Sequence, residues 1–146
     1  MRALAFAFIA AWLAMAVNAQ ERADTWRLSS KETRDAVRGT VEAQVAALRA
    51  GRLAEAYDFA ASGIRRQFTP PVFAAMLKRG YPAILDHRRF EAGTVRDDRD
   101  RRAQVVYTFI DARDTERRYR YTLVRENDRW LIEGVVPALP DKQPSI

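Results

Sequence analysis

The chain has 146 residues, no cysteine, and 25 Lys and Arg side chains against 19 Asp and Glu, which gives a formal net charge of +6. Without cysteine it cannot contain a disulfide framework, a thiolate zinc site, a cysteine nucleophile or an iron–sulfur cluster. A chain of this length suits one domain with one hydrophobic core.

The first nineteen residues have the pattern of a secretory signal peptide. Arg2 supplies a short positive region, residues 3 to 17 form an apolar run of fifteen residues, and Val17-Asn18-Ala19 places small residues where a signal peptidase cleaves. A retained membrane anchor is the alternative, but a spanning helix needs about 20 apolar residues. We therefore expect a periplasmic or secreted protein, cleaved near Ala19, with no stable membrane span after cleavage. Removing 19 of the 146 residues leaves 127, and the loss of Arg2 lowers the net charge from +6 to +5.

The positive charge of such an exported protein favours anionic partners outside the cell, such as lipid head groups, acidic glycans or acidic proteins, over nucleic acid. The densest charged stretch, RDDRDRR at residues 96 to 102, mixes four arginines with three aspartates and neutralises much of its own charge. We interpret it as a solvated turn and expect no nucleic-acid partner.

A single domain is expected over residues 29–137, after a flexible mature N-terminus at 20–28, and its first half predicts helices. SSKE at residues 29 to 32 has the form of a capping box, with Ser29 as the cap. Gly51 suits the end of the helix that follows. The apolar stripe of this helix is Val37, Val41, Val45 and Leu48.

Two more helices are predicted before the pattern changes. One runs over about 53–61, with Ser62-Gly63 as its end, and is followed by the apolar anchors Ile64 and Phe68. The other starts at Thr69-Pro70-Pro71, because proline is well suited to the first position of a helix, and ends at Gly80.

After residue 88 the apolar period changes from 3.6 to 2, which predicts four consecutive strands in RRFEAGTVR, AQVVYTFID, RRYRYTLVR and RWLIEGVVP. The two-residue turn Asn127-Asp128 sets Leu123 opposite Ile132 and Arg125 opposite Trp130. A three-residue loop at 113–115 keeps the apolar residues of the second strand on the same face. The residues expected on this inner face are Val105, Tyr107, Phe109, Tyr119, Tyr121, Leu123, Trp130, Ile132 and Val136. Residues 138–146 are expected to form a C-terminal tail.

Helices followed by an antiparallel meander predict an α+β fold in which three helices pack on the aromatic face of a four-stranded sheet. VEAQVAALRAGRLAEAYDFAASGIRRQF, TPPVFAAMLKRGYPAI and the Trp130 hairpin resemble an uncharacterised bacterial domain-of-unknown-function family (DUF4864) of the nuclear-transport-factor-2-like (SnoaL/cystatin-like) superfamily. The resemblance covers roughly Val37 to Val136. It implies a cone in which a curved sheet wraps a long helix and leaves a cavity at its wide end.

The resemblance implies little about activity, because that superfamily mixes isomerases, dehydratases, ligand-binding shells and dimerisation modules. Aromatic residues with polar tips would converge between the helices and the sheet and could line a pocket for a small apolar or anionic ligand. The alternative is that they fill the core. These candidate pocket-lining residues are Tyr57, Phe73, Tyr81, Tyr107, Tyr121 and Trp130.

An isomerase or dehydratase of the ketosteroid-isomerase type is an alternative function. It needs a carboxylate base facing a tyrosine hydroxyl inside an apolar cavity, and Asp58 or Asp86 would have to supply the base. Asp58 follows Tyr57 on a helix and points about 100° away from it. Asp86 precedes the first strand, where Asp is commonly a turn or capping residue. We therefore expect a non-catalytic binding or interaction module without a cofactor.

The only histidine, His87, lies between Asp86 and two arginines. We expect it at the polar end of a joint between the helical and sheet layers, and with one histidine and no cysteine we expect no metal site. A further alternative function is homodimerisation through the outer sheet face. The residues expected on that face are Val106, Thr108, Ile110, Thr122, Val124 and Val135.

Overall fold

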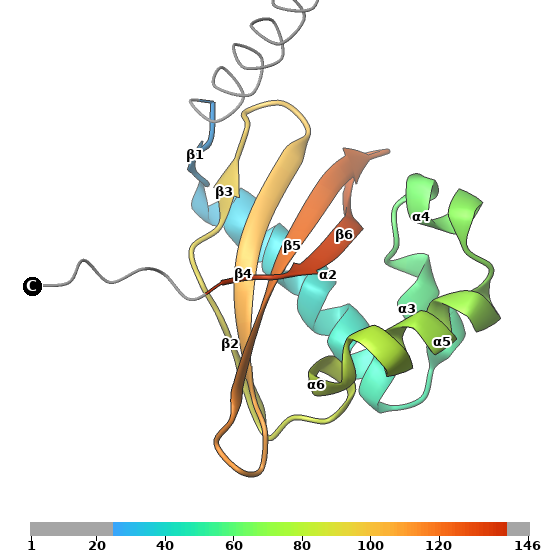
Figure 1. Cartoon of the computed structure of the whole chain (residues 1–146). Coiled ribbons are helices and arrows are strands. Elements are labelled where there is room, and N and C mark those ends of the chain that lie inside the picture. Colours follow the sequence, from blue (N-terminus) through green and yellow to red (C-terminus); the bar gives the residue numbers. More distant parts are fainter. Residues whose placement is uncertain (1–24, 140–146) are drawn as a thin grey trace, which may run out of the picture.

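A computed structural model describes residues 25–139, which form an α+β fold with five helices and a six-stranded antiparallel sheet (Figure 1). The elements are, in chain order, β1 (Arg27–Leu28), α2 (Lys31–Arg49), α3 (Leu53–Asp58), α4 (Ser62–Gln67), α5 (Pro70–Gly80), α6 (Pro82–Leu85), β2 (Arg89–Ala92), β3 (Arg96–Asp97), β4 (Arg102–Ile110), β5 (Glu116–Glu126) and β6 (Arg129–Pro137). The predicted fold class is confirmed, with two more helices and two more strands than expected. The predicted signal peptide lies outside the described residues.

The long helix α2 begins one residue later than the capping-box pattern predicts. Ser30 is the N-cap, and its side chain accepts a hydrogen bond from the Thr33 amide. Ser29 instead donates its hydroxyl to Asp97 of β3. The predicted end is confirmed, since Gly51 follows the helix with φ of 73°, a conformation that glycine adopts without strain. The predicted apolar stripe of α2 is buried throughout.

The second predicted helix is shorter than expected and a new one follows it. Helix α3 ends at Asp58, and Ser62-Gly63 begins α4 rather than ending α3. Between them the chain runs beside β6, where the Ala61 amide donates to the Ile132 carbonyl and the Ile132 amide to the Phe59 carbonyl, both at 2.8 Å. These bonds protect an edge of the sheet. Helix α5 begins and ends as predicted.

The first predicted strand is split in two. Strands β2 and β3 pair one after the other with the same edge of β4. At the break, the Gly93 amide donates to the Val106 carbonyl at 2.7 Å. A Cβ atom on residue 93 would lie 2.9 Å from that same oxygen, so the close approach requires glycine.

The predicted inner face of β4 and β5 is confirmed, with Tyr107 opposite Tyr119 and Val105 opposite Tyr121. The connection is longer than the predicted loop and spans residues 111–115 between the paired Ile110 and Glu116. The Asp111 carboxylate holds it by accepting hydrogen bonds from the amides of Arg113 and Thr115.

The pairing of β5 with β6 is confirmed near the turn, where Leu123 is opposite Ile132 and Arg125 is opposite Trp130. Beyond it a bulge places Gly134, not Glu133, opposite Thr122. One extra residue reverses the faces of the strand that follows. The predicted placement of Val136 inside and Val135 outside is therefore wrong. Val136 is 51% exposed, whereas Val135 packs against the core.

Helix α2 crosses one face of the sheet, while α3 to α6 gather near one end of it (Figure 1). The inner sheet face and the buried stripe of α2 form one hydrophobic core, whose largest fully buried side chains include Tyr107, Tyr121 and Phe109. Burying each side chain of this size contributes about 1.5–3 kcal/mol. No helix among residues 25–139 combines the length and the apolarity that crossing a bilayer requires.

Candidate functional site

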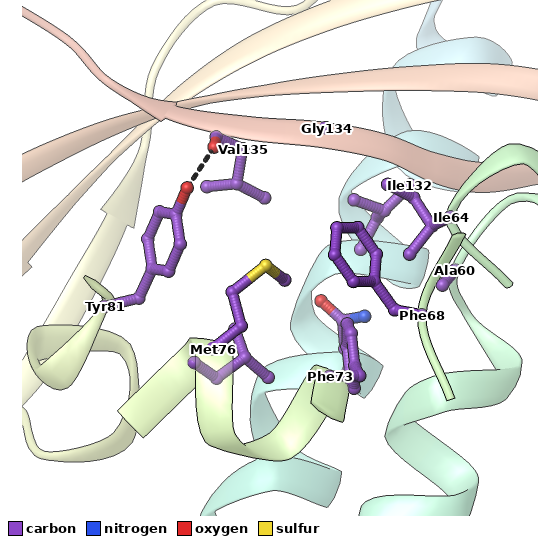
Figure 2. A pocket seen from close by; sticks show the side chains of 11 residues that line it. Ala60, Ile64, Phe68, Phe73, Met76, Tyr81, Ile132, Gly134 and Val135 are labelled. Atoms are coloured by element: carbon purple, nitrogen blue, oxygen red, sulfur yellow. Dashed lines mark hydrogen bonds between the residues drawn. The ribbon is translucent and has the colours of Figure 1, made fainter. Parts of the chain in front are cut away.

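An apolar cavity of about 150 Å³ lies where the helices meet β6 (Figure 2). Its walls come from α2, the α3–α4 connection, α4, α5 with the residue after it, and β6. The lining residues are Gln44, Ala60, Ile64, Phe68, Phe73, Met76, Leu77, Tyr81, Ile132, Gly134 and Val135.

The cavity has a buried floor and a half-buried rim. The floor consists of Gln44, Ala60, Phe73, Leu77 and Ile132, which are all buried. The rim residues are only partly buried, so the cavity is partly open to solvent on their side; they are Ile64, Phe68, Met76, Tyr81, Gly134 and Val135. Figure 2 shows the side chains of Phe68, Met76 and Val135 pointing into the space between α5 and β6.

The β6 bulge and two tyrosine hydrogen bonds shape this cavity. The bulge turns Val135 inward, and the Tyr81 hydroxyl donates to the Val135 carbonyl at 2.6 Å, which ties the end of α5 to β6 (Figure 2). The Tyr57 hydroxyl donates to the Phe68 carbonyl, also at 2.6 Å, and so fixes the end of α4. The rim is thus held by hydrogen bonds between different elements of the fold.

Residues 29–145 match the family described as Domain of unknown function (DUF4864). The chain belongs to this family. No curated protein and no solved structure matches the chain. The family description names no activity for the DUF4864 domain.

Phe73 and Tyr81 line the cavity of the DUF4864 domain, and four of the six aromatic residues singled out from the sequence lie elsewhere. Tyr57 lies behind the wall, with its ring 5.5 Å from that of Phe73. Tyr107 and Tyr121 are fully buried in the core between sheet and α2, because the aromatic face of the sheet extends well beyond the cavity. Trp130 lies at the start of β6 and is partly buried against the core.

Several residues of the cavity are not among those expected from the sequence, although the position of one of them, Gln44, indicates a buried polar contact. Gln44 lies three residues after Val41 and one before Val45, so it falls within the apolar stripe of a predicted helix. A polar residue in such a stripe is a candidate for a buried polar contact. The roles of Ala60 and Val135 depend on the edge pairing and on the bulge, which have no such signal.

The hydroxyls of the two fully buried tyrosines, Tyr107 and Tyr121, differ in their hydrogen bonding. Burial raises the pKa of both Tyr107 and Tyr121, so both remain neutral. The Tyr107 hydroxyl lies 3.5 Å from a Glu42 carboxylate oxygen. The Tyr121 hydroxyl is enclosed and has no hydrogen-bond partner among residues 25–139.

The Tyr121 hydroxyl is unpaired, whereas the Tyr81 hydroxyl donates to the Val135 carbonyl, so the same substitution at these two tyrosines should have opposite effects. Tyr121→Phe removes an unpaired buried hydroxyl and should raise the free energy of unfolding by about 1 kcal/mol. Tyr81→Phe removes a donor from the Val135 carbonyl and should lower it by about 1 kcal/mol. Urea denaturation of both variants beside the wild-type protein checks the signs. A loss of stability in Tyr121→Phe would mean that its hydroxyl has a partner.

The carboxylates required for acid–base catalysis do not lie in the cavity. Asp58 and Asp86 are both exposed, and neither lines it. Among residues 25–139 there is also no group of three or more His, Asp or Glu side chains placed to hold a metal ion. His87 joins α6 to β2 as expected, but it is only 3% exposed and not at a polar surface. Its ring packs edge-on against Phe90 and Phe109, which stack on each other, and it lies outside the cavity.

Proposed function

We propose that this domain is an exported, non-catalytic module that binds a small apolar ligand in the cavity between the helices and β6. The observation that carries the proposal is the cavity itself, about 150 Å³ in volume, with an apolar lining and a partly open rim. An engineered protein cavity of similar size stays dry and binds benzene. A ring or the end of an acyl chain would therefore fit, and the open rim lets a longer ligand extend outward.

The likeness to the nuclear-transport-factor-2-like superfamily supports the same proposal. It implies a curved sheet over a long helix with a cavity at one end, and the cavity here lies beside α2 at the end of the sheet where the short helices gather. This likeness supports the location of a ligand but not its identity, because proteins that share a fold differ in function.

The lining favours binding over catalysis. A carboxylate acts as a general base at neutral pH when it is close to the proton that it removes and its pKa is tuned by its surroundings. Asp58 and Asp86 are exposed and outside the cavity, so neither is placed to take a proton from a ligand bound there.

The outer sheet face is less suited to self-association than the sequence suggests. Of its predicted apolar residues, Ile110 and Val124 are already buried within one chain, and Val135 faces the cavity. Arg120 is exposed on this face, opposite Val106 and Val136. Two copies meeting there would bring equal charges together, which disfavours the dimer.

Export is the second part of the proposal, and it predicts a defined mature chain. The protein recovered from the periplasm or the medium should have the intact mass of a chain that starts at Gln20. Ala19→Arg should leave the uncleaved precursor in the membrane fraction, because a small residue is required at the cleavage site. Recovery of the full-length chain in soluble form inside the cell would contradict export.

Filling the cavity tests the binding proposal. Val135→Phe adds a ring from the inner face of β6 and should weaken the binding of 4-fluorotoluene, followed by ¹⁹F NMR, by at least about tenfold. Val136→Phe is the matched control, since Val136 is the next residue but points outward and is 51% exposed. It should change the affinity by less than about twofold. Equal effects of the two substitutions would place the binding outside this cavity.

A further inference from the structure

The floor of the cavity contains one polar side chain, Gln44 of α2. It is only 4% exposed, and it is surrounded by apolar lining residues. Its side-chain nitrogen donates a hydrogen bond of 3.1 Å to the Ala56 carbonyl of α3. A carbonyl only accepts hydrogen bonds, so the NH₂ group must face Ala56 and the orientation of the amide is fixed.

The amide oxygen of Gln44 is therefore directed away from Ala56, and it has no hydrogen-bond partner among residues 25–139. It also differs from the fully enclosed unpaired side-chain atoms of this part of the chain, which are Arg38 Nε and Tyr121 Oη. The Gln44 oxygen thus retains accessible surface. Because this buried side chain lines the cavity, that surface faces the cavity. The floor presents an unused hydrogen-bond acceptor.

The other polar groups of the lining do not complement an anion. The Tyr81 hydroxyl already gives its proton to the Val135 carbonyl, and no Lys, Arg or His lines the cavity. A carboxylate on the ligand would meet the Gln44 oxygen, which is also an acceptor, without a cation to compensate its desolvation. A hydrocarbon would leave the same oxygen unpaired, which is costly in a buried site.

We propose that the Gln44 oxygen selects neutral, mainly apolar ligands that carry one hydrogen-bond donor, a hydroxyl or N–H group, over both hydrocarbons and carboxylates. The inference rests on the proposed function, since it concerns the same cavity. It goes further by naming the chemical class of the ligand and the atom that recognises it.

Three probes of similar shape test this selection in the full mature chain by ¹⁹F NMR titration: 4-fluorophenol, 4-fluorotoluene and 4-fluorobenzoate. The wild-type protein should bind the phenol more tightly than the toluene, and the benzoate most weakly; a toluene that binds more tightly than the phenol would contradict the selection. Gln44→Met keeps the length of the side chain but lacks the oxygen, so it should lower the affinity ratio of phenol to toluene about tenfold. Gln104→Met, the same change on β4 outside the cavity, should leave this ratio within about twofold.

The outcomes separate this inference from the proposed function. If none of the probes binds the wild-type protein, both fail. If the phenol and the toluene bind but Gln44→Met leaves their ratio unchanged, or if the benzoate binds best, only the role of Gln44 is overturned. If Gln44→Met also abolishes the binding of the toluene, the inference is tested instead by titrating the wild-type protein with 4-fluoroanisole. Its oxygen carries a methyl group in place of the proton, and binding as tight as that of the phenol overturns the inference.

Discussion

Replacing Asp97 with alanine should lower the free energy of unfolding by about 3 kcal/mol, because it breaks a buried, charged hydrogen-bond network. Asp97 of β3 is only 5% exposed. Its carboxylate accepts hydrogen bonds from the Ser29 hydroxyl at 2.5 Å, from Arg27 Nε at 3.1 Å and from the Arg99 amide at 3.0 Å. Without it, the two side-chain donors lose their shared acceptor.

The same network joins residues 27–29 to β3. Arg27 and Leu28 form β1 beside β3, and the Ser29 amide donates to the Val95 carbonyl just before α2 begins. Asp97→Ala should therefore increase hydrogen exchange in the first turn of α2 more than in its last turn.

Lowering the pH should weaken the hydrogen bonds of Asp97 by protonating its carboxylate. Burial by itself would raise the pKa of Asp97, but the hydrogen bonds from Ser29, Arg27 and Arg99 outweigh it and hold the pKa below its ordinary value of 3.8. The contribution of Asp97 is thus present above pH 3.8 and is lost as the pH falls through the lower pKa of the folded state.

Asp100→Ala is the matched control for Asp97→Ala, because Asp100 lies exposed in the turn that follows β3. It should change the free energy of unfolding by no more than about 0.5 kcal/mol. Urea denaturation at pH 7 measures both variants. Similar losses in the two variants would show that the Asp97 network contributes little.

The parts of the fold that can be predicted from the sequence depend on interactions between neighbours. The Asn127-Asp128 turn joins two alternating strands, so it sets the pairing of Leu123 with Ile132 directly. The prolines at the start of α5 and the glycine after α2 act within one turn of a helix. The α+β class follows from the same local periodicities.

The remaining features depend on contacts between distant segments. The bulge at Glu133 and the break between β2 and β3 leave no mark in the alternation, and Gly93 is explained only by the Val106 carbonyl beside it. The sequence indicates aromatic residues between helices and sheet but does not indicate which of them line a cavity. The positions of α4 and α5 determine where a cavity remains between the helices and the sheet. Phe73 and Tyr81 therefore line the cavity, while Tyr107 is buried in the core.

Lowering the pH below about 6.5 should destabilise the protein through His87, its only histidine. The ring is packed edge-on against Phe90 and Phe109, at centroid distances of 5.1 and 5.0 Å. Nδ1 lies 3.1 Å from the Ala83 carbonyl and Nε2 lies 3.3 Å from a guanidinium nitrogen of Arg49. The carbonyl requires a proton on Nδ1 and Arg49 requires a lone pair on Nε2, so the imidazole is neutral.

The surroundings of His87 lower its pKa below the ordinary value of 6.5. Burial is the main cause, and the positive charge of Arg49 acts in the same direction, against the opposing effects of the Ala83 and Ile84 backbone and of Asp86. In this range the unfolded chain binds a proton that the folded chain does not, so the free energy of unfolding rises with pH. The contribution is complete above pH 6.5 and is lost as the pH falls toward the pKa of the folded state, by about 1.4 kcal/mol for each unit between the two pKa values.

His87→Asn provides the test, because the asparagine amide can still donate to the Ala83 carbonyl but does not titrate. The lost ring contacts should lower the free energy of unfolding at pH 8 by about 2 kcal/mol. Between pH 6.5 and pH 5 the wild-type protein should lose stability while the variant remains level, since unfolded carboxylates titrate mainly below pH 5. Urea denaturation across this range measures both slopes. A level profile in the wild-type protein, or the same slope in both proteins, would show that the folded state accepts the proton on His87 as readily as the unfolded chain does.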